Sequence, residues 1–301
     1  MKVTVFTPTY NRAYILRQLY ESLKKQTNKN FEWLVVDDGS SDETEKLIHE
    51  FQEESKEFEI RYIKKENGGK CRAINTGLDL ANNELFFTVD SDDYLTADAI
   101  EKIISWEADL PQGKKFAGIV ANKGFSEIET VNSFFDEEYI DTNLLDAQRY
   151  EENGKRVLAG ERAYIFYTEV HRHYKYPEFE GEKFMTEAVT WNRMAKDGYL
   201  VRFYNDIIWV FEYQDDGLTK AGSKLFLNNP RGYGLWLREK AEFERYSLKD
   251  RIKMYVTFTC DMSSLYSSKM IAEYIGGSMI LISIVNICHK VFRKLCRGEN
   301  E

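Results

Sequence analysis

The stretch that decides the fold is Leu85-Phe86-Phe87-Thr88-Val89-Asp90-Ser91-Asp92-Asp93. Its first five residues form an apolar run typical of a buried β-strand, and three carboxylates follow where that strand would end. Carboxylates two positions apart at a strand end can bind one divalent cation, which in turn can hold a diphosphate. A solvated turn capped by an aspartate is the better explanation of the Asp-rich turn when it is taken alone. The residues that precede them decide between the two interpretations.

Residues 1–90 alternate between short apolar runs and amphipathic segments. The apolar runs predict strands over residues 3–6, 33–36, 60–63 and 85–89. Apolar residues at helical spacing predict helices over residues 13–26 and 70–81. Another helix is expected to start at Asp42, which forms a capping-box pattern with Glu45. This order predicts an α/β fold, with a mainly parallel sheet flanked by helices on both faces.

Polar clusters follow these strands or open these helices, at residues 7–12, 37–40, 67–72 and 90–93. Parallel sheets of this class bind ligands at the carboxyl ends of their strands, where the strand order reverses. We therefore expect the four clusters to meet at one edge of the sheet. That convergence favours a binding site over a solvated turn at Asp90.

The clusters resemble the motifs of the family 2 glycosyltransferases of GT-A (Rossmann-like) fold. The resemblance is carried, in order, by TPTYNR at 7–12, VVDDGSSD at 35–42, NGGKCRAINTG at 67–77 and DSDD at 90–93. It is strong over residues 1–95 and looser to about residue 215. It implies an inverting, metal-dependent transfer of a sugar from a nucleotide-sugar, foremost a UDP-sugar, with Mg²⁺ or Mn²⁺ as cofactor. The implied acceptor is a glycan or a lipid-linked sugar in the synthesis of a bacterial-type cell-surface polysaccharide such as a capsule.

The residues also suggest how a nucleotide would be held. Tyr10 could stack on the base, while the adjoining backbone bonds its edge. Lys70 and Arg72 open a helix, where free N–H groups and positive charge favour phosphate. By resemblance, Asp38 meets uracil, while Asp90 and Asp92 form the DXD motif, with Asp93 as a supporting residue. The candidate nucleotide-binding residues are Thr7, Pro8, Thr9, Tyr10, Arg12, Asp38, Lys70, Arg72, Asp90 and Ser91, and the candidate metal ligand is Asp92, with Asp90 as a possible second.

Inverting transfer also needs a general base that deprotonates the acceptor hydroxyl. In the family this base is an acidic residue that opens a helix, commonly in a Glu-Asp pair. The matching stretch here is residues 180–191, in which Ala188 follows Glu187, so the chain departs from the pair. Glu187 is favoured because it begins an apolar helical face, and Glu182 is the alternative. Either glutamate could instead be a helix-start charge that the helix dipole favours.

Two other features carry weaker hypotheses. His171 and His173 lie two apart in what we expect to be an exposed strand, and without a third ligand nearby ordinary surface is the better interpretation than metal binding. Residues 217–220, with Lys224 and Arg231 further on, resemble a family loop that closes over donor or acceptor.

Near residue 223 the sequence pattern changes to one that predicts helices. We expect a GT-A domain over residues 1–222, with a nucleotide-binding half (1–95) and an acceptor half (96–222), and a helical region over 223–301. Residues 274–288 carry no charge and precede a basic tail, but about twenty apolar residues are needed to span a bilayer. These residues could pack on neighbouring helices, or lie at a membrane surface with the basic tail on anionic lipid.

Composition narrows the function classes. The 41 Lys and Arg against 50 Asp and Glu give a net charge of −9, which disfavours nucleic acid as a partner. Four cysteines without a CxxC pair, and no apolar leader at the N-terminus, predict reduced thiols and a cytoplasmic enzyme, with a peripheral location at the inner face of the cell membrane as the alternative. A sugar nucleotidyltransferase would carry a Gly-rich loop after residues 3–6, where none occurs. A catalytically inactive glycan-binding or scaffolding domain remains the non-enzymatic alternative, because Ala188 breaks the base motif.

Overall fold

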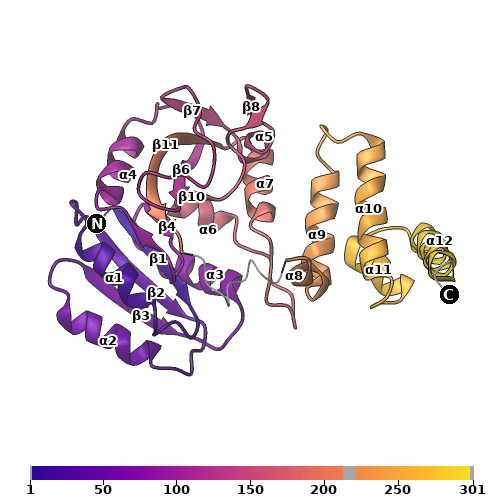
Figure 1. Cartoon of the computed structure of the whole chain (residues 1–301), viewed down its shortest axis with the longest axis horizontal. Helices are drawn as coiled ribbons and strands as arrows, with labels where there is room; N and C mark the ends of the chain where they lie inside the picture. Colours follow the sequence, from indigo (N-terminus) through magenta and orange to yellow (C-terminus); the bar gives the residue numbers. More distant parts are fainter. Residues whose placement is uncertain (1, 213–221, 299–301) are drawn as a thin grey trace. The chain divides into compact units, whose positions relative to one another are not determined.

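The computed structural model describes residues 2–212 and 222–298, which form two compact units (Figure 1). The first unit contains Met1–Tyr176 and Thr190–Asp215, and the second contains Pro177–Val189 and Asp216–Glu301. Residues 177–189 therefore group with the C-terminal helices, although they lie in the stretch assigned above to the acceptor half. The expected boundary at residue 222 stays a prediction.

The first unit is built on the parallel strands that the sequence predicts. They are β1 (Val3–Thr9), β2 (Phe31–Asp37), β3 (Glu59–Lys64) and β4 (Leu85–Thr88), in the spatial order β3-β2-β1-β4. The connecting helices are α1 (Leu16–Lys24), α2 (Thr44–Glu54) and α3 (Lys70–Leu80). Figure 1 shows α1 and α2 on one face of the sheet and α3 on the other. The expected α/β architecture is confirmed.

The sheet continues as a mixed sheet beyond β4. β10 (Arg162–Tyr167) is antiparallel to both β4 and β6 (Phe116–Gly124), and β11 (Leu200–Val210) is parallel to β6. β5 (Tyr94–Leu95) and β7 (Tyr139–Thr142) are each antiparallel to β11, while β8 (Glu151–Glu152) and β9 (Lys155–Arg156) form a separate ribbon. The remaining helices of this part are α4 (Ala99–Ala108), α5 (Leu144–Ala147), α6 (Thr168–His173) and α7 (Ala188–Lys196).

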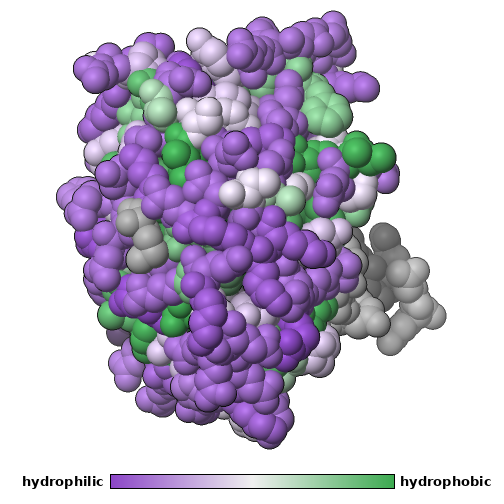
Figure 2. Space-filling model, turned by 90° about the vertical axis from the view of Figure 1, so that its left-hand side faces the viewer, coloured by the Kyte–Doolittle hydropathy of each residue, from purple (hydrophilic) through white to green (hydrophobic). Residues whose placement is uncertain are grey.

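The larger core of the first unit lies between the sheet and the helices α1, α2 and α4. Tyr20 of α1 stacks on Phe51 of α2 with ring centroids 4.1 Å apart, and both pack near the buried Trp33 of β2. Burying side chains of this size stabilises the fold by about 1.5–3 kcal/mol each. The molecular face drawn in Figure 2 is, by contrast, predominantly hydrophilic.

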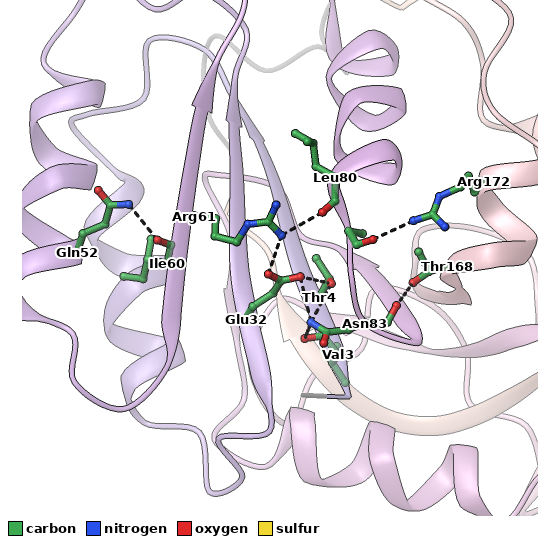
Figure 3. A network of polar contacts seen from close by, with 11 residues as sticks. Val3, Thr4, Glu32, Gln52, Ile60, Arg61, Leu80, Asn83, Thr168 and Arg172 are labelled. Carbon is green, nitrogen blue, oxygen red and sulfur yellow. Dashed lines mark hydrogen bonds and ion pairs between the residues drawn. The ribbon is translucent and has the colours of Figure 1, made fainter.

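A buried carboxylate joins the first strands on the other face of the sheet (Figure 3). Glu32 of β2 is 1% exposed and accepts hydrogen bonds from the Thr4 hydroxyl (2.7 Å) and the Asn83 amide (3.0 Å). The Arg61 guanidinium supplies the opposite charge at 2.9 Å. A buried charge costs several kcal/mol unless it is paired and hydrogen-bonded, so these contacts are what allow Glu32 inside the sheet.

Two arginines bind the C-terminal end of α3. Arg61 donates to the carbonyl of Leu80 (3.0 Å), and Arg172 donates to those of Leu78 (2.9 Å) and Ala81 (2.8 Å). Cations at this end of a helix satisfy its orphan carbonyls and oppose its dipole. α3 is therefore anchored at the end away from the polar clusters.

The second unit is a set of helices, as expected for the C-terminal region. They are α8 (Ser223–Leu227), α9 (Pro230–Ala241), α10 (Leu248–Met262), α11 (Ser268–Ile275) and α12 (Met279–Gly298). Their apolar cluster includes Leu237, Phe258, Ile271, Ile275 and Ile282. Gly276 adopts φ +66° and ends α11, so the uncharged stretch is divided between two helices. No helix in the described ranges has both the length and the apolar character to cross a membrane.

The expected strand at His171 is wrong. Residues 168–173 form the short helix α6, and His171 is 3% exposed, with its ring edge-on to Phe86, Phe166 and Tyr176. Burial lowers the pKa of His171 to about 3. His173 is exposed. The two histidines therefore do not share a metal-binding face.

The expected capping box at Asp42 is also wrong. α2 begins at Thr44, and no side chain caps it in that way. The Asp42 carboxylate instead accepts from the backbone N–H and hydroxyl of Thr44 (3.1 and 2.6 Å) and from the N–H of Ala13 (3.1 Å). Its second oxygen thus connects the loop after β2 to the loop after β1.

Candidate functional site

The candidate site lies at the carboxyl ends of β1, β2 and β4. The chain runs outward from β1 to β2 and β3 and then returns to β4 on the other side of β1. Strand order therefore reverses between β1 and β4, which is the usual ligand position in open α/β sheets. The polar clusters of the sequence all lie here, and hydrogen bonds or ion pairs join each one to the next.

Asn11 joins the first cluster to the second. Its backbone N–H donates to the Ser40 hydroxyl (2.8 Å), and its side-chain oxygen accepts from the Ser41 N–H (2.8 Å). Asn11 has φ +53°, a conformation that asparagine tolerates better than most residues. The loops after β1 and β2 are thereby fixed to each other.

Asp38 joins the second cluster to the third. Its buried carboxylate accepts from the Lys65 ammonium (2.8 Å) and from the backbone N–H groups of Gly68 (2.9 Å) and Gly69 (2.7 Å). Gly69 has φ +95°, so a side chain there would be strained. Asp38 therefore shapes the turn that starts α3, and most of its acceptor capacity is used in doing so. Its contact with uracil stays a prediction.

Lys70 joins the third cluster to the fourth. It is the first residue of α3, as the sequence predicts, and its ammonium lies 2.6 Å from an Asp90 oxygen. Arg72, two residues on, donates to the Gly68 carbonyl (3.1 Å). The N-terminus of α3 thus brings backbone N–H groups and positive side chains to the carboxylates after β4, an arrangement that suits an anionic ligand.

The carboxylates after β4 differ in their electrostatics. Burial acts to raise the pKa of Asp90, but the ammonium groups of Lys70 and Lys123 outweigh it and hold that pKa below its ordinary value. Burial and the negative charge of Asp90 raise the pKa of Asp92, with Arg12 opposing them. The protein therefore compensates the ionised form of Asp92 less well than that of Asp90.

The carboxylate of Asp93 is hydrogen-bonded to other groups of the protein. Its buried carboxylate accepts from the Trp209 indole N–H (2.7 Å) and from the backbone N–H of Glu212 (3.2 Å). Burial and the charge of Asp90 raise the pKa of Asp93. These contacts fit the supporting role expected for it.

Lys123 is a site residue that the sequence analysis did not single out. It lies on β6, a strand buried throughout, with its ammonium 3.5 Å from the centroid of the Trp209 ring. Its charge lowers the pKa of Asp90 and partly offsets the rise in the pKa of Asp93. The available signal was a lysine at the end of the apolar run 116–121, because a buried lysine needs an anionic partner.

The residues after β1 divide into buried and exposed ones. The Thr7 hydroxyl is buried and accepts from the Trp33 indole (3.0 Å), so this side chain supports the sheet. Pro8 is half-buried and Ser91 is buried. The Thr9 hydroxyl is buried and has no hydrogen-bond partner within the described ranges. Tyr10 is 49% exposed, which leaves its ring accessible to a base.

The two candidate bases lie in the second unit and in different environments. Glu182 is buried, and its carboxylate accepts from the N–H groups of Arg231 (2.8 Å) and Gly232 (2.9 Å) in the first turn of α9. Glu187 directly precedes α7, as expected for the residue that opens that helix. Glu182 thus fits the alternative interpretation, in which the glutamate is a negative charge at the start of a helix, here α9.

The candidate closing loop is only partly described. Residues 217–220 lie outside the described residues. Lys224 is in α8, and Arg231 is in the first turn of α9.

The family model for Glycosyl transferase family 2 matches residues 4–114, a stretch that contains all four polar clusters. The chain carries a family 2 glycosyltransferase domain.

Curated relatives match this same part of the chain. The domain is similar to Glycosyltransferase GlyA of Streptococcus pneumoniae serotype 4, with 38% identity over 120 residues, which are 38% of this chain and 17% of that protein. Putative glycosyltransferase EpsH of Bacillus subtilis is 31% identical over 107 residues, covering 36% of this chain and 30% of that protein. The matched stretch thus spans less than a third of either relative.

Solved structures share the fold of this chain over most of its length. TarS 1–349 of S. aureus, in complex with UDP-GlcNAc, covers 98% of this chain and 92% of its own, with a TM-score of 0.59 and 16% identity. The mannosyltransferase PcManGT of Pyrobaculum calidifontis, in complex with GDP-Man and Mn²⁺, covers 97% and 88%, with a TM-score of 0.56 and 16% identity. At this identity the likeness is one of fold, and that fold is GT-A.

Proposed function

We propose that the protein is an inverting glycosyltransferase that moves a sugar from a nucleotide-sugar, foremost a UDP-sugar, to a glycan or lipid-linked acceptor of a cell-surface polysaccharide. The observation that carries this proposal is the meeting of Asp90, Asp92 and the start of α3 at the strand-order reversal. The nucleotide-sugar complexes of TarS and PcManGT support a donor of this class for the fold.

The carboxylates fit a divalent cation that is shared with the donor. Asp92 is partly buried beside Asp90, and their mutual repulsion, which raises the pKa of Asp92, would be relieved by a cation. Within the described ranges no group of three or more His, Cys, Asp or Glu residues could hold a metal ion. The donor set therefore suits an ion that takes its other ligands from phosphate and water, as Mg²⁺ commonly does. Asp92, together with Asp90, would hold Mg²⁺ or Mn²⁺, which stabilises the negative charge of the departing nucleoside diphosphate.

The protein's own groups supply the remaining functions. Lys70 and the first N–H groups of α3 bind the diphosphate, with Arg12 adding positive charge beside Asp92. The exposed ring of Tyr10 stacks on the base. Glu187 accepts the proton of the acceptor hydroxyl, which makes that oxygen nucleophilic enough to displace the diphosphate in a single step.

The test is a panel of UDP- and GDP-sugars, with Mn²⁺ or with a chelator, followed by measurement of nucleoside diphosphate release and of nucleotide binding. Asp92→Asn keeps the side-chain shape and removes the charge, so it should lower turnover by more than about 100-fold and abolish the Mn²⁺ dependence of binding. Asp79→Asn is the matched control, because Asp79 is 59% exposed on α3. Wild-type turnover and metal-dependent binding in Asp92→Asn would show that the metal assignment is wrong.

A further inference from the structure

Helix α12 presents an apolar stripe to the outside of the second unit. The exposed fractions are 70% for Ile280, 53% for Ile284, 62% for Ile287 and 52% for Val291. Residues spaced by three or four positions lie on one face of a helix. These side chains therefore form one continuous strip, which we call the Ile280–Val291 stripe.

The opposite face of α12 is the one that packs on the unit. Ile282 is buried in the cluster formed with α10 and α11, and Asn286 is buried and donates to the Ser268 hydroxyl (2.9 Å). Ile282 and Asn286 are four positions apart and alternate with the stripe residues along the helix. The helix is thus held by one face and is apolar on the other, which is unusual for a surface helix of a water-soluble protein.

The charge of α12 indicates what the stripe contacts. The helix contains no Asp or Glu, and its second half carries Lys290, Arg293, Lys294 and Arg297. This occurs in a chain with a net charge of −9, so positive charge is concentrated locally. An apolar strip joined to a group of basic residues complements an anionic headgroup layer lying over acyl chains. The group of four basic residues reaches the size at which such segments recognise anionic lipid.

We propose that α12 docks on an anionic lipid bilayer, with the Ile280–Val291 stripe at the headgroup–acyl boundary and the basic half of the helix on the lipid phosphates. This goes beyond the proposed function, because it concerns a surface of the second unit and does not depend on which sugar is transferred. The described part of α12 lies along the bilayer surface in this arrangement, consistent with the lack of a spanning helix among the described residues.

The experiment is co-sedimentation of the full chain with two kinds of vesicle. One is phosphatidylcholine alone, and the other contains about one-third phosphatidylglycerol. Binding to the anionic vesicles that weakens with salt is expected, with little binding to neutral ones. Ile284→Asp with Ile287→Asp should reduce this binding by more than about tenfold, and so should Lys290→Glu with Lys294→Glu.

Ile128→Asp is the matched control, because Ile128 is an isoleucine 89% exposed in the first unit and should tolerate the change without effect on binding. Equal binding to neutral and anionic vesicles, no binding at all, or undiminished binding of the Ile284→Asp/Ile287→Asp variant would overturn the proposal. Dissociation of a dimer in that variant, measured by size-exclusion chromatography without lipid, would assign the stripe to a second copy instead. Nucleotide-sugar turnover without vesicles tests the catalytic proposal separately, and should be normal in both α12 variants.

Discussion

The two candidate bases, Glu182 and Glu187, can be distinguished experimentally because they have different contacts in the structure. The Glu182 carboxylate binds two N–H groups at the start of α9, whereas Glu187 precedes α7. We predict that Glu182→Ala releases the first turn of α9, and that Glu187→Gln removes sugar transfer without affecting α9. The stability of α9 is therefore the quantity that distinguishes the two residues.

The size of the Glu182 effect follows from the two hydrogen bonds. The N–H of Gly232 belongs to a buried residue and would be left without its acceptor, while Arg231 is exposed and its N–H can bind water instead. A lost charge-assisted bond costs about 1.5–3 kcal/mol when the donor stays buried, and less when water replaces the acceptor. The sum is about 2–4 kcal/mol, comparable to the loss of a strong helix cap. At 1.4 kcal/mol per factor of ten, that is about 30- to 700-fold in the opening equilibrium.

Hydrogen exchange measured by mass spectrometry reports this quantity directly for peptides from α9. Glu182→Ala should speed exchange there by the factor just given, and Glu182→Gln, which keeps one acceptor oxygen, should do so less. Glu180→Ala is the control, because Glu180 is exposed two residues away. Glu187→Gln should leave α9 exchange unchanged and lower transfer by about 10²- to 10⁴-fold, with nucleotide binding intact.

One result would refute this reasoning. If Glu182→Gln abolished transfer with normal exchange in α9, while Glu187→Gln retained activity, Glu182 would be the base and its two backbone contacts would be incidental.

Three further predictions concern stability. His171 is buried and its pKa is lowered, so below about pH 6.5 the unfolded chain takes up a proton that the folded chain does not. The free energy of unfolding should therefore fall by about 2 kcal/mol from pH 7 to pH 5. In urea unfolding, His171→Leu should remove this part of the pH dependence of stability, and His173→Gln should not. Asp92→Asn should raise the apparent Tm of the metal-free protein, because it removes a repelled, partly buried charge, and an unchanged or lower Tm would contradict this. Gly77→Ala should cost about 1–3 kcal/mol in thermal unfolding, because its Cβ would lie 2.2 Å from the Phe6 ring, and a neutral result would show that α3 shifts freely on β1.

The sequence was sufficient for the strands and for the helix that starts at Lys70. β1, β2 and β4 are buried, so each had to be a short apolar run, and the polar residues that follow each run marked its end. Gly68 and Gly69 likewise marked the turn before α3. These features depend on residues close together in the chain, which is why a local pattern reveals them.

What the sequence did not reveal depends on distant partners. The segment at His171 contains Thr and Val at strand-like spacing, yet Arg172 donates to the end of α3, and the helix α6 places His171 against Phe86. Such tertiary contacts override local propensity. Lys123 was missed for the same reason, since Asp90 and Asp93 lie far from it in the chain.

The family motifs identify the site, but they do not say which of its side chains remain available to a ligand. Thr7 and Asp38 belong to those motifs, yet the hydroxyl of Thr7 and the carboxylate of Asp38 are engaged with Trp33 and with the turn before α3. Asp92 is different, because burial and a like charge oppose its ionised form, and a protein retains such a group only where something else repays the cost. A cation shared with a diphosphate would repay it. The incomplete compensation of Asp92 by the protein's own groups is therefore the physical reason to expect a cation at this carboxylate.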